Sequence, residues 1–241
     1  MEGVRDVGGE AEMILLREHR IAPCTNCLQC YAFTGPGIGP CSIRDDMDAI
    51  VPKIAEADGV LFASPVHSGF VTGLMTSFNE RMVWRVLRPG GRFCGICSLL
   101  SRLDDKVRAV GSIVSAGGMP EGLGSRFCND GTAWLKSNMP LEMHGQWIGG
   151  LYVGADLERV PESEQDWKRV YFLRKVSDRQ REQARALGRK MVGAIRGGRL
   201  KAFTLKRLFP APMRWIAELF APRSCYGLVG DAKRCGEEEG A

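Results

Sequence analysis

The sequence predicts an α/β fold, in which helices cover both faces of a doubly wound parallel sheet. Two segments of strand length, residues 59–63 and 107–115, are rich in apolar residues, as are strands that a parallel sheet buries on both faces. Segments with apolar residues at helical spacing lie between and after them. Strands that alternate with helices indicate βαβ units, and such units place helices on both sides of one sheet.

The N-terminal third predicts two strands and two helices. Residues 13–16 form a short apolar run that we expect to be a buried strand. Asp45 is expected to cap a helix that continues to about residue 57, because Met47, Ile50 and Ile54 repeat at helical spacing. The strand at residues 59–63 ends at Ser64-Pro65, and a second helix is expected over residues 73–86.

The remaining elements complete the alternation. The strand at residues 107–115 stops at Gly117-Gly118, and a weaker strand is expected at about residues 141–153. Residues 178–196 predict a helix with Leu187, Met191 and Ile195 on one side. We therefore expect one α/β domain over residues 10–196, followed by an extension over residues 197–241.

Four cysteines form the pattern that is most specific to one chemistry. Cys24, Cys27, Cys30 and Cys41 are spaced C-x2-C-x2-C-x10-C within residues 24–41. The C-x2-C-x2-C core is the spacing with which ferredoxin-type loops hold an iron–sulfur cluster. Zinc sites more often pair two C-x2-C arms, and unligated thiols are the other alternative. The connector at residues 35–40 is rich in Gly and Pro, so it can turn back and bring Cys41 to the triplet.

Composition and charge exclude several classes of protein. The chain has 241 residues, 44% of them hydrophobic and 25% charged, which is typical of a globular protein with one sizeable core. It has no signal-peptide pattern and no apolar run long enough to span a membrane, so we expect a cytoplasmic protein. In that compartment nine cysteines favour metal or redox chemistry over disulfides. The net charge of +5 comes without a nucleic-acid motif, so we expect no nucleic-acid partner.

Beyond these patterns, the chain resembles the flavodoxin-like NADPH-dependent FMN reductases, and its cysteine loop resembles that of their iron–sulfur flavoprotein branch. The resemblance covers roughly residues 10–196, and its motifs follow one another in the family's order. They are Pro23-Cys24 with the cysteine triplet, Asp45-Asp46-Met47, Ala57-Asp58-Gly59-Val60, Ser64-Pro65-Val66-His67, residues 69–73, Phe78, Arg81, Ser115-Ala116-Gly117-Gly118 and Ala186-Leu187-Gly188-Arg189.

The resemblance implies an FMN site at the carboxyl ends of two strands, which is also where open α/β sheets bind ligands. The first loop would wrap the flavin ring, and the glycines of the second would let the ring approach the backbone. Taken alone, either loop could equally be an ordinary tight strand exit. The residues of the two loops are Ser64, Pro65, Val66, His67, Ser68, Gly69, Ser115, Ala116, Gly117 and Gly118.

The chain departs from the family pattern at three side chains and at its start. His67 replaces a Tyr, Thr76 replaces a Lys and Glu80 replaces an Asp. Only about a dozen residues precede Met13, so the first strand and the loop that holds the FMN phosphate are expected to be missing. That strand is central in the order 2-1-3-4-5, so the second and third strands should pair directly or leave a gap, and FMN binding should be weak.

Two further features have alternative interpretations. Cys94 and Cys97 lie in an apparent insertion at residues 88–106, where a C-x2-C is a redox pair, half of a zinc site or, more simply, two buried thiols. The basic and amphipathic tail at residues 200–222 predicts a packing helix, within the chain or between the subunits of a homo-oligomer, with peripheral contact to an anionic membrane as the alternative.

Together these observations predict an FMN-dependent oxidoreductase with NAD(P)H as donor and a 4Fe-4S cluster. Its partner would be a small electron acceptor such as a quinone, or a redox protein. The protein would position the flavin, which performs the chemistry, so no catalytic side chain is expected. The alternative is a non-catalytic metal-binding or partner-binding module on a truncated scaffold of the same fold.

Overall fold

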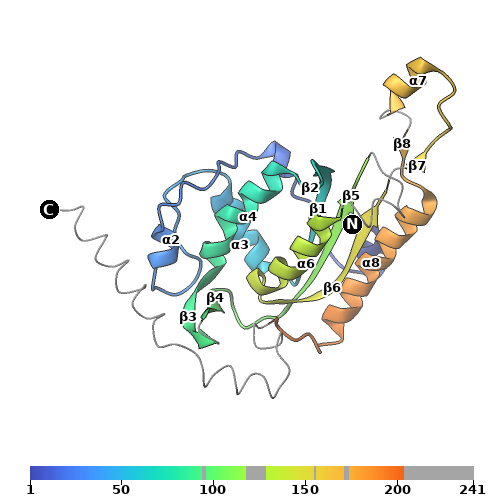
Figure 1. The fold of residues 1–241 in the computed structure, drawn as a ribbon. Coiled ribbons are helices and arrows are strands. Elements are labelled where there is room, and N and C mark those ends of the chain that lie inside the picture. Colours follow the sequence, from blue (N-terminus) through green and yellow to red (C-terminus); the bar gives the residue numbers. More distant parts are fainter. Residues whose placement is uncertain (94–95, 118–128, 155, 171–173, 204–241) are drawn as a thin grey trace.

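The computed structural model describes residues 1–93, 96–117, 129–154, 156–170 and 174–203. Figure 1 shows a sheet flanked on both sides by helices, with the small helix α7 (Glu164–Lys168) projecting away from the rest of the chain. The predicted α/β class is therefore confirmed. Of the C-terminal extension, residues 204–241 lie outside this description, and with them most of the predicted tail helix.

The central sheet has four strands in the order β2-β1-β5-β6. Strands β1 (Gly59–His67), β5 (Arg108–Ser115) and β6 (Gly145–Val153) are parallel, and the short β2 (Phe70–Val71) turns back on the end of β1 in an antiparallel pair. Val60 of β1 is level with Val110 of β5, and Pro65 is level with Ser115. The carboxyl ends of β1 and β5 therefore lie side by side.

Each face of the sheet has its own apolar core. On one face lie α3 (Met47–Glu56), α4 (Gly73–Val86) and α6 (Asp130–Glu142), which bury Val51, Met82 and Leu135 against the sheet residues Val110 and Val114. On the other face α8 (Asp178–Arg196) packs its apolar side against β5 and β6. The bounds of α4 and α8 agree with the predicted helices at residues 73–86 and 178–196.

The N-terminal segment does not form the predicted strand. Residues 13–16 lead into a short 3-10 helix, Leu16–Glu18, in which the His19 N–H donates to the carbonyl of Leu16. Ile14 and Leu16 pack on the core that α3 and α4 share, while Met13 is exposed. This segment is held by packing of its side chains rather than by hydrogen bonds to a neighbouring strand. A short apolar run is compatible with both arrangements, and the surrounding structure decides between them.

Of the two arrangements expected for the second and third strands, direct pairing or a gap, direct pairing is not formed. Within the described residues β1 pairs with β5 along its length and with β2 only at Val66 and His67. Among the described residues, no strand pairs with the edge of β1 that faces away from β5 between Gly59 and Pro65. Leu61, which is 37% exposed, lies on that strand.

Several smaller elements were not anticipated. The helix α1 (Glu2–Arg5) packs on α8 so closely that a Cβ on Gly3 would lie 2.0 Å from the carbonyl oxygen of Arg185. The insertion at residues 88–106 contains the hairpin β3 (Leu87–Phe93) and β4 (Ile96–Ser101). The remaining elements are α2 (Gln29–Ala32), β7 (Asp156–Leu157) and β8 (Arg174–Lys175).

Helix α6 explains why the last strand of the sheet begins later than predicted. Residues 141 and 142 belong to this helix, so β6 starts at Gly145 rather than near residue 141. The helix contains Pro140 close to its end and begins at Asp130, after Asn129. Because proline and asparagine are typical of turns, the sequence did not predict a helix here. None of the helices described here is long and apolar enough to cross a membrane.

A carboxyl group is buried between α4 and α6. Glu142 is 3% exposed, and the side-chain amide of Asn79 lies against it, with its nitrogen 2.7 Å from Glu142 Oε2 when the amide is oriented to donate. Burial raises the pKa of Glu142 from 4.5 to about 8, although the hydrogen bond from Asn79 acts to lower it. The folded protein therefore holds this carboxyl in its protonated form at neutral pH.

The Glu142→Gln variant should gain stability relative to the parent as the pH rises. Between the two pKa values only the folded state keeps the proton, so the parent loses stability as the pH rises from about 4.5 to about 8. Glutamine does not titrate, so the difference in unfolding free energy should grow by about 3 kcal/mol between pH 5 and pH 8. Urea unfolding at several pH values measures it. Glu56→Gln, at an exposed carboxyl, is the control, and parallel curves for Glu142→Gln and the parent would contradict the burial.

Candidate functional site

The four cysteines of the C-x2-C-x2-C-x10-C motif line one cavity. Cys24 and Cys27 are exposed, Cys30 is half-buried and Cys41 is buried. One wall of the cavity is the side of α4 that carries Glu80, and the other wall is the cysteine loop itself. The residues around the cavity are Cys24, Thr25, Asn26, Cys27, Leu28, Cys30, Cys41, Ser42, Ile43, Glu80, Arg81 and Trp84.

The backbone of the cysteine loop is held in an uncommon conformation. Asn26 and Leu28, on either side of Cys27, have φ angles of 54° and 58°. The left-handed region costs a residue with a side chain about 1 kcal/mol, and such residues cluster at functional sites. The Asn26 N–H donates to Cys24 Sγ at 3.4 Å, and Cys27 Sγ lies 3.0 Å from Ser42 Oγ. These contacts fold the triplet toward the segment that holds Cys41.

Cys41 returns to the triplet because its connector is fixed to α4. The Gly39 N–H donates to the carbonyl of Arg85 at 2.7 Å, and Arg85 Nε donates to the Gly39 carbonyl at 3.1 Å. A Cβ at Gly39 would lie 3.1 Å from the carbonyl oxygen of Trp84, so glycine permits this close approach. The predicted fold-back of the Gly- and Pro-rich connector is thus seen in the structure.

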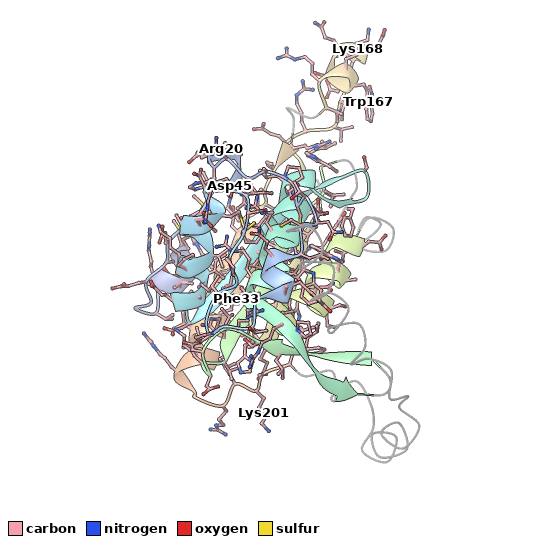
Figure 2. All side chains as sticks on the ribbon, turned by 90° about the vertical axis from the view of Figure 1, so that its left-hand side faces the viewer. Arg20, Phe33, Asp45, Trp167, Lys168 and Lys201 are labelled. Carbon is pink, nitrogen blue, oxygen red and sulfur yellow. The ribbon has the colours of Figure 1, made fainter. Side chains whose placement is uncertain are left out.

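A buried ion pair lies beneath the cavity. Arg81 and Asp45 have side chains that are 0% and 1% exposed, with Arg81 Nη1 and Asp45 Oδ2 separated by 2.6 Å. Asp45 also accepts hydrogen bonds from the N–H groups of Ala22 and Met47. The expected helix cap at Asp45 is wrong, since Asp46 is the N-cap of α3, and Asp45 instead links the segment before the cysteine loop to α3 and α4. Figure 2 shows it beside Arg20, and Arg20 donates its backbone N–H to the neighbouring Asp46.

Arg81 has one donor that no described protein group satisfies. Its two Nη atoms donate to Asp45 and to the carbonyls of Ala22 and Ile43, but its buried Nε has no hydrogen-bond partner. Burial alone would lower the pKa of Arg81, but Asp45 and the nearby Cys41 raise it. Arg85 Nη1, on the next turn of α4, is likewise buried without a partner among the described residues.

The thiols of the loop have different proton affinities. Burial, together with the proximity of Cys41 and Cys24, raises the pKa of Cys30. The pKa of Cys27 is lowered, chiefly by its hydrogen bond with Ser42. Thiolates that repel one another are near neighbours, and a bound metal removes this repulsion by coordinating them.

The donor set fits a cysteine-ligated cluster, although the thiols do not yet form a ready-made site. Across the described residues no three His, Cys, Asp or Glu side chains stand close enough to hold a metal ion. Four cysteine thiols on one cavity are nevertheless the donors with which proteins hold an iron–sulfur cluster. Cys24, Cys27, Cys30 and Cys41 are the residues that would hold it, and the cavity that they line has a volume of about 20 Å³.

Most of the first predicted flavin loop belongs to a strand, because β1 does not end at Ser64-Pro65 as expected but continues to His67. Ser64 is buried, and its hydroxyl accepts a hydrogen bond from the Thr72 N–H at 3.1 Å, so this side chain supports the loop. Val66 and His67 pair with β2, and His67 is exposed. Ser68 and Gly69 form the turn, with φ angles of 50° and 80°. The loop is therefore a tight hairpin that presents His67 and an open Gly69.

The second predicted loop follows β5, next to the first. Because Pro65 is level with Ser115, both loops leave the same edge of the sheet. The Ala116 N–H donates to the carbonyl of Val153, which fixes this exit to β6. A Cβ at Gly117 would lie 1.5 Å from Arg174 Nη1, so the guanidinium of Arg174 covers this glycine. Gly118 lies outside the described residues.

Sequence reasoning did not identify the arginines that organise the cysteine loop. Arg102 of the insertion donates to the carbonyls of Cys30, Phe33, Gly35 and Leu87, and its guanidinium stacks on the Phe33 ring. Of the residues that depart from the family pattern, Glu80 lines the cysteine cavity. The second C-x2-C remains a prediction, because Cys94 and the side chain of Cys97 lie outside the described part of the chain.

The fold and site define a class, namely an α/β protein with loops at adjacent parallel strand ends and a four-cysteine loop packed on the following helix. The model of the NADPH-dependent FMN reductase family matches residues 1–120. Through this N-terminal half, the chain belongs to the NADPH-dependent FMN reductase family.

Curated relatives of this chain carry the name iron-sulfur flavoprotein. One from Archaeoglobus fulgidus is 34% identical over 89 residues, which are 37% of this chain and 40% of the relative. One from Methanocaldococcus jannaschii is 34% identical over 90 residues, which are 37% of this chain and 43% of the relative. The matched segment thus spans about two fifths of these relatives. A solved flavone reductase superimposes with a TM-score of 0.47 at 16% identity, over 81% of this chain and 56% of that one.

Proposed function

We propose that this chain is an FMN-dependent oxidoreductase that holds a 4Fe-4S cluster on Cys24, Cys27, Cys30 and Cys41. The observation that carries the proposal is that these four cysteines line one cavity on α4. Membership of the FMN reductase family supports the flavin, and the names of the curated relatives support the combination of flavin and cluster. NAD(P)H is the proposed donor, and a quinone-like molecule or a redox protein is the proposed acceptor.

The proposed flavin and cluster positions are linked by α4. Thr72 caps this helix next to the β1 exit, and its hydroxyl accepts from the Met75 N–H. Arg81, beneath the cysteines, lies nine residues further, about 14 Å along the helix axis. One rigid element therefore fixes the distance between the two proposed sites. When bound, FMN would exchange hydride with NAD(P)H, and the cluster would exchange single electrons.

The residues of this chain would supply position and charge. Arg81 places a buried positive charge against Cys41, which favours the thiolate form of a ligand. Asp45 fixes the orientation of that guanidinium with two hydrogen bonds. At the other site, the exposed His67 and the open Gly69 would face the flavin.

A visible spectrum of anaerobically purified protein, with iron and sulfide analysis and an FMN titration, tests the proposal. Flavin bands that bleach on addition of NAD(P)H, together with a broad brown absorbance and acid-labile sulfide, are expected. A colourless protein that neither binds FMN nor contains iron would overturn the proposal and favour the non-catalytic module.

Replacing Gly117 with Val should weaken FMN binding by about tenfold or more. A side chain at this position must displace Arg174 and adds bulk where the ring would approach the end of β5. Fluorescence titration with FMN measures the change. Gly193→Ala is the control, because Gly193 lies in α8 with open space around it. Unchanged affinity in Gly117→Val would show that the flavin site is elsewhere.

A further inference from the structure

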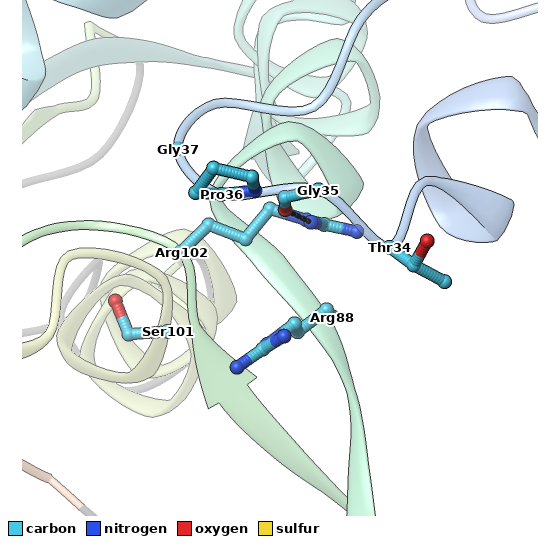
Figure 3. Close-up of a pocket in the computed structure, with 7 residues that line it drawn as sticks. All are labelled: Thr34, Gly35, Pro36, Gly37, Arg88, Ser101 and Arg102. Carbon is cyan, nitrogen blue, oxygen red and sulfur yellow. Dashed lines mark hydrogen bonds between the residues drawn. The ribbon is translucent and has the colours of Figure 1, made fainter.

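A second pocket lies between the β3–β4 hairpin and the connector of the cysteine loop. Its volume is about 370 Å³, and residues 34–37, Arg88, Ser101 and Arg102 line it. Figure 3 shows Arg88, Ser101 and Arg102 around one space below the Gly35–Gly37 turn. The pocket adjoins the carboxyl end of α4, a helix of 14 residues and about 20 Å, whose other end adjoins the β1 exit. It is therefore separate from the proposed flavin site.

The pocket has positive charge without a matching negative charge. Arg102 is only 7% exposed, and all the acceptors recorded for its guanidinium are backbone carbonyls. Arg88, on the neighbouring strand, forms no hydrogen bond or ion pair with any described residue. No described carboxylate lies within ion-pair distance of either arginine. Two guanidinium groups that repel one another would be stabilised by an anion between them.

The donors that remain unused point to the kind of anion. Four of the five N–H hydrogens of Arg102 are directed at carbonyls, which leaves one on Nη1. Ser101 Oγ accepts from the Leu103 N–H at 3.0 Å, so its own hydrogen is available to donate. No described residue accepts a hydrogen bond from the guanidinium of Arg88. Donors from three side chains suit the several oxygens of a phosphate group.

We infer that Arg88, Ser101 and Arg102 form a binding site for the phosphate group of a small molecule. The pocket is within the size range of small-molecule sites and exceeds what a single inorganic phosphate fills. Gly37 has a φ of 78° and no atom within 4 Å of its Cβ position, so the turn leaves room for the rest of the ligand. This inference goes beyond the proposed redox function and does not depend on it.

The site is directly connected to the cysteine loop. The same Arg102 that faces the pocket holds the carbonyls of Cys30, Phe33 and Gly35. A bound phosphate would neutralise Arg102 and fix its guanidinium, and so would steady the segment between Cys30 and Cys41.

Calorimetric titration of the full chain with pyrophosphate tests the site. We expect binding that weakens as salt is added, because the attraction between phosphate and guanidinium is screened. Arg88→Gln should reduce the affinity about tenfold, since it removes one charged fork from an exposed side chain that supports no other group. Arg44→Gln, at a guanidinium that is 80% exposed and lies outside the pocket, is the matched control and should bind as the parent does.

Parallel titrations with inorganic phosphate and adenosine 5′-diphosphate distinguish the sources of the phosphate. Tighter binding of the nucleotide than of pyrophosphate would identify a nucleotide site, and equal binding an inorganic or sugar phosphate site. In both cases the site is supported if Arg88→Gln loses affinity and the control Arg44→Gln does not. No binding of any of the three probes at low salt, or equal affinity of Arg88→Gln and the parent, would overturn the inference. Circular dichroism of each variant establishes that it is folded.

Discussion

Cys27→Ser is expected to abolish iron binding in anaerobically prepared protein. Cys27 is the central thiol of the triplet, and residues on both sides of it adopt left-handed backbone angles that direct the loop toward the cavity. Its hydrogen bond with Ser42 lowers its thiol pKa, which favours the thiolate that iron requires. Serine offers a much poorer ligand with a far higher pKa, so one of the four proposed coordination sites is lost.

Iron and acid-labile sulfide per chain, with the visible spectrum, measure the effect of Cys27→Ser. We expect at least a tenfold loss of both relative to the parent, since even the loss of a residue that only supports a metal ligand costs about 10- to 100-fold in affinity. Cys225→Ser, at a cysteine outside the proposed ligand set, is the control and should retain the parent's iron content. Iron at the parent's level in Cys27→Ser would exclude this residue as a ligand.

Asp45→Ala is expected to lower the free energy of unfolding by about 3–5 kcal/mol, the usual cost of breaking a buried ion pair. Asp45 accepts hydrogen bonds from both Nη atoms of Arg81, at 2.6 and 3.1 Å, and from the backbone of Ala22 and Met47. Its removal leaves the guanidinium of Arg81 buried without a counter-charge. The segments before and after the cysteine loop would then lose their common anchor on α4.

Asp46→Ala is the matched control for Asp45→Ala. The two carboxylates are adjacent in sequence, but the side chain of Asp46 is 47% exposed, so its removal should cost less than about 1 kcal/mol. Chemical denaturation measures both variants. A loss of similar size in both would show that the Arg81–Asp45 pair does not anchor the loop.

The pH dependence of stability gives an independent measure of the same pair. Burial alone would raise the pKa of Asp45, but the hydrogen bonds from Arg81, Ala22 and Met47 hold it below its ordinary value of 3.8. The stabilisation by this carboxylate is therefore present above that value and is lost as the pH falls through the folded-state pKa. Asp45→Ala should unfold with a weaker dependence on acid than the parent.

The sequence alone determined the elements whose local pattern has one solution. The helices at residues 73–86 and 178–196 were predicted with the bounds they have, because long amphipathic repeats leave little choice of secondary structure. The strands β1 and β5 were predicted because apolar runs that end in Ser-Pro or Gly-Gly indicate buried parallel strands. The alternation of these elements also predicted that β1 and β5 end at the same edge of the sheet, although β1 continues past Ser64 to His67.

The spacing of the cysteines, with short spacers and a turn-rich connector, predicts a shared metal site. In the structure the four cysteines line one cavity, and the metal site itself stays a prediction. Only the tertiary structure decided how the loop is held, since Arg81, Arg85 and Arg102 act on groups that are far away in the sequence. Charged residues such as these give no periodic signal, and their partners are mostly backbone carbonyls that every sequence contains.

Tertiary context also decided the elements that were predicted wrongly. Residues 13–16 have the composition of a strand, but a strand needs a neighbour with which to pair, and here their side chains pack on α3 and α4 instead. Helix α6 was missed because Asn129 and Pro140 resemble turn residues, whereas burial of Leu135 and Met139 against the sheet holds the helix together. The local sequence pattern thus determined which segments could be buried. Strand pairing and side-chain packing between distant parts of the chain determined whether each segment is a helix, a strand or neither.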